Sequence, residues 1–287
     1  MKHGLSFVNY WSICEGSDPS LSALDAQRSD LGFIASFNPT NPGAPRTIVD
    51  GPEEVRKKVR ELVRAGADVI KVATSGGVLS PRDDPRHAHF DLVELRTIVA
   101  EASAAGLSVM AHAQATEGIK NAVRAGVKSI EHGFYLDDEA IELMIANGTY
   151  LVLTLVAPTG VSKAAAAGAR IPEASIRKAS EVIDIHRQSF AKAVQAGVKI
   201  AMGTDTGVTP HGDNLEELTL MANGGMDRRD VLVAATQSAA DLMAIGTDVG
   251  SVTPGKRADL TVIGGDPLEF DDWTIESVWK SGVKVVG

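Results

Sequence analysis

Cysteine is almost absent from this chain. Its 287 residues include one cysteine, Cys14, so no disulfide can form within the chain. Because disulfides belong to oxidising compartments, this composition is consistent with a reducing one, and we expect a cytoplasmic protein. No apolar strand or neighbouring base supports Cys14 as a nucleophile, and we expect it to be an ordinary small residue.

Positive charge and long apolar runs are also scarce. The 28 Lys and Arg residues are outnumbered by 37 Asp and Glu residues, which gives a formal net charge of −9. This sign argues against nucleic acid or an anionic membrane surface as the main partner. The sequence shows neither an apolar run of about 18 residues nor a basic leader followed by an apolar segment, so it predicts no membrane span and no secretory signal. We expect a small-molecule substrate instead.

The stretch from Leu107 to Gly133 carries the clearest pattern. It reads LSVMAHAQATEGIKNAVRAGVKSIEHG, in which two short apolar runs are separated by one helical segment. This order is typical of a strand–helix–strand unit in a parallel sheet. The two runs end in His112 and His132, so both imidazoles are expected at the carboxyl ends of neighbouring strands. That edge is where α/β folds place their chemistry, which favours a functional site over two core histidines.

The same alternation of helix and strand recurs along the chain. Further strands are expected at 67–77, 149–158 and 198–205, and helices at 50–66, 90–106, 137–148 and 173–197. The alternation predicts an α/β fold of the (β/α)8 type, a TIM barrel. A doubly wound sheet would alternate in the same way. However, no GxGxxG or GxxxxGK[ST] loop follows any strand, which favours the barrel.

The two ends of the chain differ from this middle part. Residues 1–50 contain a predicted strand at 5–13 and then a long loop rich in Pro, Asn, Ser and Gly. Residues 51–248 form the predicted barrel domain, with two helices after its last strand. Residues 249–287 contain the short β runs ADLTVIG, IESVWKSG and VKVV. They predict a small β element appended to the barrel.

Four ionisable residues lie at or near strand ends: Lys71 in VIKVAT, His112, His132, and Asp205 in MGTD. A lysine surrounded by apolar residues in a strand is costly unless it is paired, shifted in pKa or chemically modified. Two neutral imidazoles and a carboxylate suit zinc or another divalent ion. Such an ion lowers the pKa of its bound water toward neutrality, and Asp205 would be placed to accept the proton.

These residues resemble a known family. SIEHG, GTDTG, IKVATSGG and the tail motif PGKRADLTVIGGDPL together resemble the amidohydrolase superfamily, in its imidazolonepropionase-like and Xaa-Pro dipeptidase-like branch. The resemblance spans roughly residues 50–287. It implies that Lys71 is carboxylated and bridges two metal ions, that His112 and His132 bind the second metal, and that Asp205 binds the first and shuttles the proton. It also implies that the tail is half of a small β-sandwich and that the segment after Lys71 covers the mouth of the site, with Ser80, Arg82, Asp83, Arg86 and His87.

One departure from the family pattern is large. The N-terminal portion that carries a strand ending in His-x-His is lacking, and the only His-x-His, His87-Ala-His89, lies before a helix with no apolar strand leading into it. We expect those two histidines to be loop residues. By comparison with the family pattern we expect two strands and half of the sandwich to be missing, and six strands cannot close a standard barrel. A shortened chain, a split enzyme with a completing partner chain, and a homo-oligomer with a rearranged N-terminus all fit.

The missing ligands reduce the expected site. We expect one metal ion, with zinc favoured over other divalent ions, held by His112 and His132 and completed by Asp205 or Lys71. A second ion would need ligands that the sequence does not reveal, and without it the carbamate on Lys71 is less secure.

The leading hypothesis is a metal-dependent hydrolase that acts on an amide C–N bond of a small molecule or dipeptide-like substrate. Hydrolysis of a lactone, carbamate or organophosphate is an alternative, because such metal sites attack many polarised centres. A non-catalytic remnant that binds a metal or a partner without turnover is another, which the missing His-x-His favours.

Several other polar residues are weaker candidates for substrate contact. Gln114 and Thr116 follow His112, and either could touch substrate or support the next helix. Tyr135 could steady an oxyanion or pack in a loop. His211 follows Asp205 and could line the mouth. His186 lies within the long helix at 173–197 and is expected to be a surface or packing residue.

Overall fold

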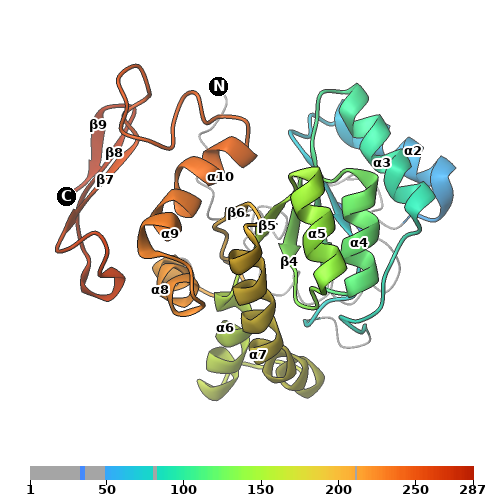
Figure 1. The fold of residues 1–287 in the computed structure, drawn as a ribbon, viewed down its shortest axis with the longest axis horizontal. Helices are drawn as coiled ribbons and strands as arrows, with labels where there is room; N and C mark the ends of the chain where they lie inside the picture. Colours follow the sequence, from blue (N-terminus) through green and yellow to red (C-terminus); the bar gives the residue numbers. More distant parts are fainter. Residues whose placement is uncertain (1–32, 36–48, 80–82, 211) are drawn as a thin grey trace.

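A six-stranded sheet forms the centre of the chain (Figure 1). The computed structural model describes residues 33–35, 49–79, 83–210 and 212–287. The strands lie in the order β1-β2-β3-β4-β5-β6, in which β2 to β6 are parallel and β1 is antiparallel to β2. Their bounds are β1 Phe33–Ala35, β2 Ile70–Ala73, β3 Val109–Ala113, β4 Ser129–His132, β5 Tyr150–Val152 and β6 Ile200–Ala201. In the part of the chain described, strand pairing ends at β1 and β6.

Helices connect the parallel strands and cover the sheet, with α2 to α5 side by side in Figure 1. Their bounds are α2 Gly51–Arg64, α3 Leu92–Ala104, α4 Thr116–Ala125, α5 Asp138–Asn147, α6 Val156–Ala166, α7 Glu173–Ala196, α8 Glu216–Asn223, α9 Arg228–Ala235 and α10 Gln237–Leu242. Asp91 and Glu94 form a capping box at the start of α3, and the Asp137 side chain caps α5. α4, α5 and α7 end at Gly126, Gly148 and Gly197 in left-handed conformations, which glycine adopts without steric cost.

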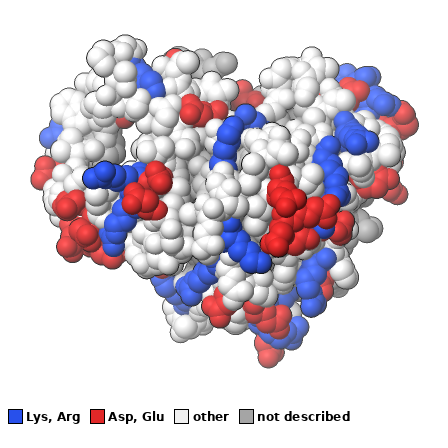
Figure 2. All heavy atoms as spheres, in the orientation of Figure 1, with Lys and Arg blue, Asp and Glu red and all other residues white. Residues whose placement is uncertain are grey.

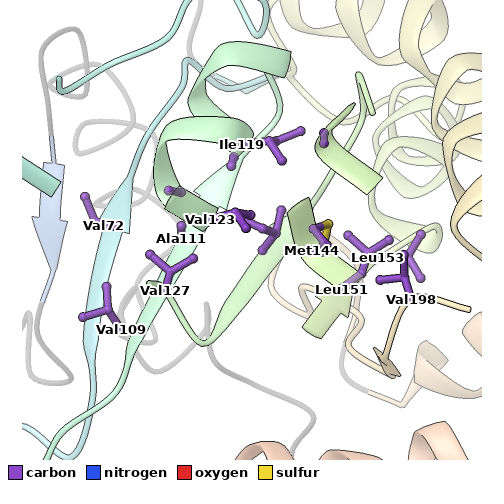
Figure 3. Packing of buried hydrophobic residues seen from close by; sticks show 14 of the residues in the cluster. Val72, Val109, Ala111, Ile119, Val123, Val127, Met144, Leu151, Leu153 and Val198 are labelled. Carbon is purple, nitrogen blue, oxygen red and sulfur yellow. The ribbon is translucent and has the colours of Figure 1, made fainter. Parts of the chain in front are cut away.

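The main core lies between this layer of helices and one face of the sheet (Figure 3). One register row crosses five strands and joins Val72, Ala111, Ile130, Leu151 and Ile200, all of them buried in the same cluster. Since side chains alternate along a strand, the neighbouring row points to the other face. That second row contains His112 and Glu131 as direct register partners. The apolar row therefore anchors the sheet while the row beside it presents ionisable groups.

Ion pairs tie α4 to α5 on the outer surface. Figure 2 shows acidic side chains gathered over α5 with basic side chains beside them. Lys120 lies 2.9 Å from Asp137 and 2.8 Å from Glu139, and Arg124 also pairs with Glu139. Hydrogen bonds from Lys120 to these carboxylates raise its pKa.

A separate antiparallel sheet of three strands forms the C-terminal end, beside α8 to α10 in Figure 1. It consists of β7 Leu260–Gly264, β8 Thr274–Lys280 and β9 Val283–Val286. The small β element predicted from the three apolar runs is confirmed. In the described ranges, no helix is both long enough and apolar enough to cross a membrane.

Three local predictions were wrong. The strand predicted at 149–158 ends at Val152, and Val156–Ala166 forms the helix α6, which was not predicted. The run VLTLVAP is buried in any case, so its apolar composition does not distinguish strand from helix. Phe33–Ala35, expected in a loop, forms β1. The two helices expected after the last barrel strand are three, because a break at Thr236 separates α9 from α10. The strand predicted at 5–13, like Cys14, lies outside the described residues.

Candidate active site

Three of the four predicted site residues lie on strands at the carboxyl end of the sheet. Lys71 is in β2, His112 in β3 and His132 in β4, and all three are buried. Asp205 follows β6 and is half-buried. The prediction that successive parallel strands bring these side chains to one edge rests on the pairing of β2 with β3 and of β3 with β4, and both pairings are observed.

The two histidines touch each other. Their ring centroids are 4.7 Å apart and the rings meet edge to face at 69°. His112 Nε2 lies 3.2 Å from the carbonyl oxygen of Gly76, and His132 Nδ1 lies 2.7 Å from the hydroxyl oxygen of Thr154. One nitrogen of each ring is thus fixed by a neighbouring oxygen, an arrangement that orients a metal-binding histidine.

Both imidazoles are held in the neutral form. Burial, with a smaller effect of the Lys71 charge, lowers the pKa of His112 to about 4. Burial also lowers the pKa of His132 well below its ordinary value, assisted by His112 and Lys71. A neutral imidazole is the form that binds a metal ion.

Two carboxyl groups share this environment. Burial raises the pKa of Asp205 to about 6, although the Lys71 charge opposes the shift. Burial also raises the pKa of Glu131 to about 7, against a 2.5 Å hydrogen bond from the Ser129 hydroxyl and the Lys71 charge. The Lys71 charge therefore acts on both histidines and both carboxyls.

Glu131 is a site residue that the sequence analysis missed. It immediately precedes His132 in SIEHG, and an ionisable side chain inside a short apolar strand was the available signal. Its register partner across the sheet is His112.

The ends of three successive strands adopt an unusual backbone conformation. His132, Thr154 and Asp205 have φ values of 73°, 58° and 53°, in the left-handed region that residues other than glycine rarely occupy. Such strain costs of order 1–3 kcal/mol per residue and concentrates at functional sites. At His132 the left-handed φ ends β4 and lets the side chain reach His112, although alternation along the strand would place it with Ile130 in the core. Thr154 was also missed, because nothing in TLVAP marks it.

Residues 75–79 and 83–90 lie against the carboxyl end of β2. Ser75 pairs with Ala88, and Lys178 of α7 donates hydrogen bonds to the carbonyls of Gly77 and Asp83 at 3.1 and 2.8 Å. His89 Nε2 lies 3.5 Å from Asp83. His87 and His89 are loop residues, as expected, while Ser80 and Arg82 lie outside the described residues. Arg86 is exposed and paired with Asp84.

The weaker candidates have different surroundings. Gln114 is buried, its backbone N–H donates to the Ser75 hydroxyl at 2.7 Å, and its Oε1 atom has no hydrogen-bond partner among the described residues. Thr116 donates to the Tyr135 carbonyl at 2.7 Å, which supports the turn after β4. Burial raises the pKa of Tyr135. Their contact with substrate stays a prediction.

The structure describes one of the two remaining candidate histidines, His186, but not the other, His211. His186 is buried and packs against the Phe134 ring at 4.3 Å, so it is a packing residue. His211 lies outside the described part of the chain.

Comparison with known proteins agrees with this geometry. A model of the Amidohydrolase family matches residues 1–286. The chain belongs to the amidohydrolase family. The ochratoxinase of Aspergillus niger is 37% identical over 267 residues, which cover 88% of this chain and 54% of the relative. Imidazolonepropionase of Caldanaerobacter subterraneus is 27% identical over 188 residues, which cover 63% of this chain and 40% of the relative.

Solved structures of amidohydrolases also resemble this chain. A Xaa-Pro dipeptidase with methionine bound in its active site superposes with a TM-score of 0.80 and 38% identity, covering 88% of this chain and 65% of that one. The A. niger ochratoxinase superposes with a TM-score of 0.72 and 36% identity, covering 86% and 59%. The branch inferred from the motifs and the (β/α)8-type fold are both confirmed. The chain spans about half the length of the ochratoxinase it matches, 54%.

Amidohydrolases generally bind divalent metal ions. His112 and His132 fit such an ion as two ligands, because both are buried, neutral and oriented by a second hydrogen bond. In the described ranges, however, no three His, Cys, Asp or Glu side chains lie close enough together to hold an ion. The assignment of Lys71 and Asp205 as further ligands stays a prediction.

Proposed function

We propose that this amidohydrolase acts on an amide C–N bond of a small molecule or dipeptide-like substrate. The observation that carries the proposal is the pair of neutral, buried histidines in edge-to-face contact, each with one ring nitrogen fixed by a neighbouring oxygen. The names of its relatives support the choice of bond, since ochratoxinase and Xaa-Pro dipeptidase are among them.

We propose zinc as the ion and His112 and His132 as its ligands. A bound zinc ion supplies a water of lowered pKa and polarises the carbonyl to be attacked. The histidines would bind through Nδ1 of His112 and Nε2 of His132, since the other nitrogens contact Gly76 and Thr154. Lys71, with Ala73, Ile70 and Val72 around it in β2, would complete the site if carbon dioxide converts it to a carbamate.

Asp205 is the proposed proton acceptor. Its raised pKa of about 6 leaves it mostly ionised at neutral pH yet a stronger base than an exposed aspartate. Its left-handed backbone fixes the direction of the carboxylate at the end of β6. We also propose that the protein is cytoplasmic. The edges of the sheet at β1 and β6 would be covered by a second copy of the chain or by a completing partner chain.

An Asp205→Asn variant tests this role. We expect kcat for N-acyl amino acids and Xaa-Pro dipeptides to fall by about 100- to 10,000-fold with little change in KM, because the amide cannot accept the proton. Asp184→Asn, on the exposed side of α7, is the matched control and should leave kcat unchanged. Equal turnover by the Asp205 variant and the wild-type chain would remove this residue from the mechanism.

A second candidate function is supported by one observation. The described residues hold no three-ligand group of His, Cys, Asp and Glu, as a non-catalytic chain that binds a metal or a partner would also show. Two measurements distinguish these hypotheses. They are elemental analysis of protein purified without chelators, and assays on amides, lactones, carbamates and organophosphates. Bound zinc with amide turnover supports the hydrolase, zinc without turnover supports the non-catalytic chain, and preferred lactone or phosphotriester turnover changes the substrate class.

A further inference from the structure

A buried carboxylate far from the histidines in sequence is connected to one of them. Glu217 lies in α8 and is fully buried. Its two oxygens accept hydrogen bonds from the backbone N–H groups of Leu155 at 2.8 Å and Val156 at 2.7 Å, which are 62 and 61 residues away. These two N–H groups stand at the start of α6, where backbone donors have no partner within the helix.

The turn whose N–H groups bond to Glu217 also contains the residue that contacts His132. Thr154 directly precedes Leu155, and its hydroxyl oxygen lies 2.7 Å from His132 Nδ1. Thr154 has a φ of 58°, which is unfavourable for a β-branched residue unless the surroundings impose it. The Ala157 N–H bonds to the Thr154 carbonyl at 3.0 Å, so the turn is fixed by one bond from within and by two from Glu217.

We infer that Glu217 is a positioning residue for His132. By fixing Leu155 and Val156 it holds the strained Thr154 backbone, and the Thr154 hydroxyl then accepts the Nδ1–H of His132 and leaves Nε2 to face a ligand. The consequence for metal binding rests on the proposed function, whereas the effect on the His132 tautomer does not.

Helix capping alone does not explain why the group that bonds to the start of α6 comes from another helix. α3 and α5 are capped by their own neighbouring residues, Asp91 and Asp137. α6 has no side-chain cap at Leu155, and a carboxylate from another helix takes that place. Burying a carboxylate is costly, and a local Ser, Thr or Asp would satisfy the same donors at the surface. The buried connection fixes the Thr154 turn relative to α8, the helix that follows the Asp205 loop.

Nuclear magnetic resonance of the full chain, with ¹⁵N-labelled histidine and metal removed, tests the inference. We expect wild-type His132 to carry its proton on Nδ1. In Glu217→Gln, the side-chain NH2 group faces one of the two N–H donors, so one bond is lost, and His132 should shift to a mixture of tautomers. Glu216→Gln is the matched control, since Glu216 pairs with Lys163 on the surface, and it should leave the His132 signal unchanged.

Zinc titration gives the second readout. We expect Glu217→Gln to weaken zinc binding by about 10- to 100-fold, as loss of an orienting contact does. Thr154→Val removes the hydroxyl directly and should reproduce the tautomer change, while Thr154→Ser should retain the wild-type signal. If Glu217→Gln does not fold, Glu217→Asp keeps the carboxylate but shortens its reach, and the same spectrum is recorded.

An unchanged His132 tautomer in a Glu217 variant whose Leu155 and Val156 amide resonances have moved would overturn the inference and leave Glu217 as a helix cap. A chain that shows the tautomer change but binds no zinc and hydrolyses no amide would contradict the proposed function and leave the positioning role intact.

Discussion

Two strands of this chain that both begin with valine have opposite environments. All five residues of β3, VMAHA, are buried, and all four residues of β9, VKVV, are exposed. Val109 in β3 is 3% exposed, whereas Val283 in β9 is 64% exposed. The residue type is the same, so β-propensity does not account for the difference.

The elements that pack on each sheet account for the difference in exposure between β3 and β9. The six-stranded sheet lies under helices that bury the row from Val72 to Ile200, and its other face encloses Lys71, His112 and Glu131. The three-stranded sheet leaves Val262, Ile275, Val283, Val285 and Val286 substantially exposed. Burial is therefore imposed by what packs on a strand, and the same burial that stabilises the large sheet shifts the pKa values of its ionisable groups.

A matched pair of isoleucine substitutions should give the largest contrast. Ile130→Ala in β4 removes a fully buried side chain and should lower the free energy of unfolding by about 2–5 kcal/mol. Ile275→Ala in β8, where the side chain is 40% exposed, should cost about 1 kcal/mol or less. Chemical denaturation of both variants measures the difference. Equal losses would show that the small sheet is packed as tightly as the large one.

Acid should destabilise the interior of the barrel region through a buried histidine. Burial lowers the pKa of His186 to about 3 from an ordinary 6.5, so below pH 6.5 the unfolded state binds a proton that the folded state does not. The folding stability that this histidine supplies is thus present at neutral pH and is lost as the pH falls toward 3. From pH 7 to pH 4 the wild-type chain should therefore lose about 3 kcal/mol more of its free energy of unfolding than His186→Gln loses. Parallel pH curves for the two proteins would contradict this.

A surface ion pair of the tail should have the smallest effect. Arg257 lies 2.8 Å from Asp259, but the two side chains are 45% and 31% exposed. Because solvent screens such pairs, Arg257→Met should change the free energy of unfolding by about 0.5 kcal/mol or less. A loss comparable to that of Ile130→Ala would mean that the pair anchors the small sheet to the rest of the chain.

The sequence predicted the barrel-like part well because its units are local. The helix before each of β2 to β6 is followed within two residues by a glycine, each of these strands is a short apolar run, and the two histidines follow runs of the same kind. The strand at 149–158 was predicted too long because its apolar composition does not distinguish strand from helix, and the carboxyl group that bonds to the start of α6 belongs to Glu217, 61 residues beyond Val156. Phe33–Ala35 was assigned to a loop because three residues carry no periodicity, and its strand exists by pairing with β2.

The sequence by itself therefore determined most of the order of helices and strands, the family, and the positions of Lys71, His112, His132 and Asp205 at or near strand ends. Those features depend on composition and spacing over short distances. The tertiary structure decided which nitrogen of each histidine is engaged, the strained turn at Thr154, and the places of Glu131 and Glu217. These depend on hydrogen bonds and burial between segments that are distant in the chain, and no local pattern encodes them.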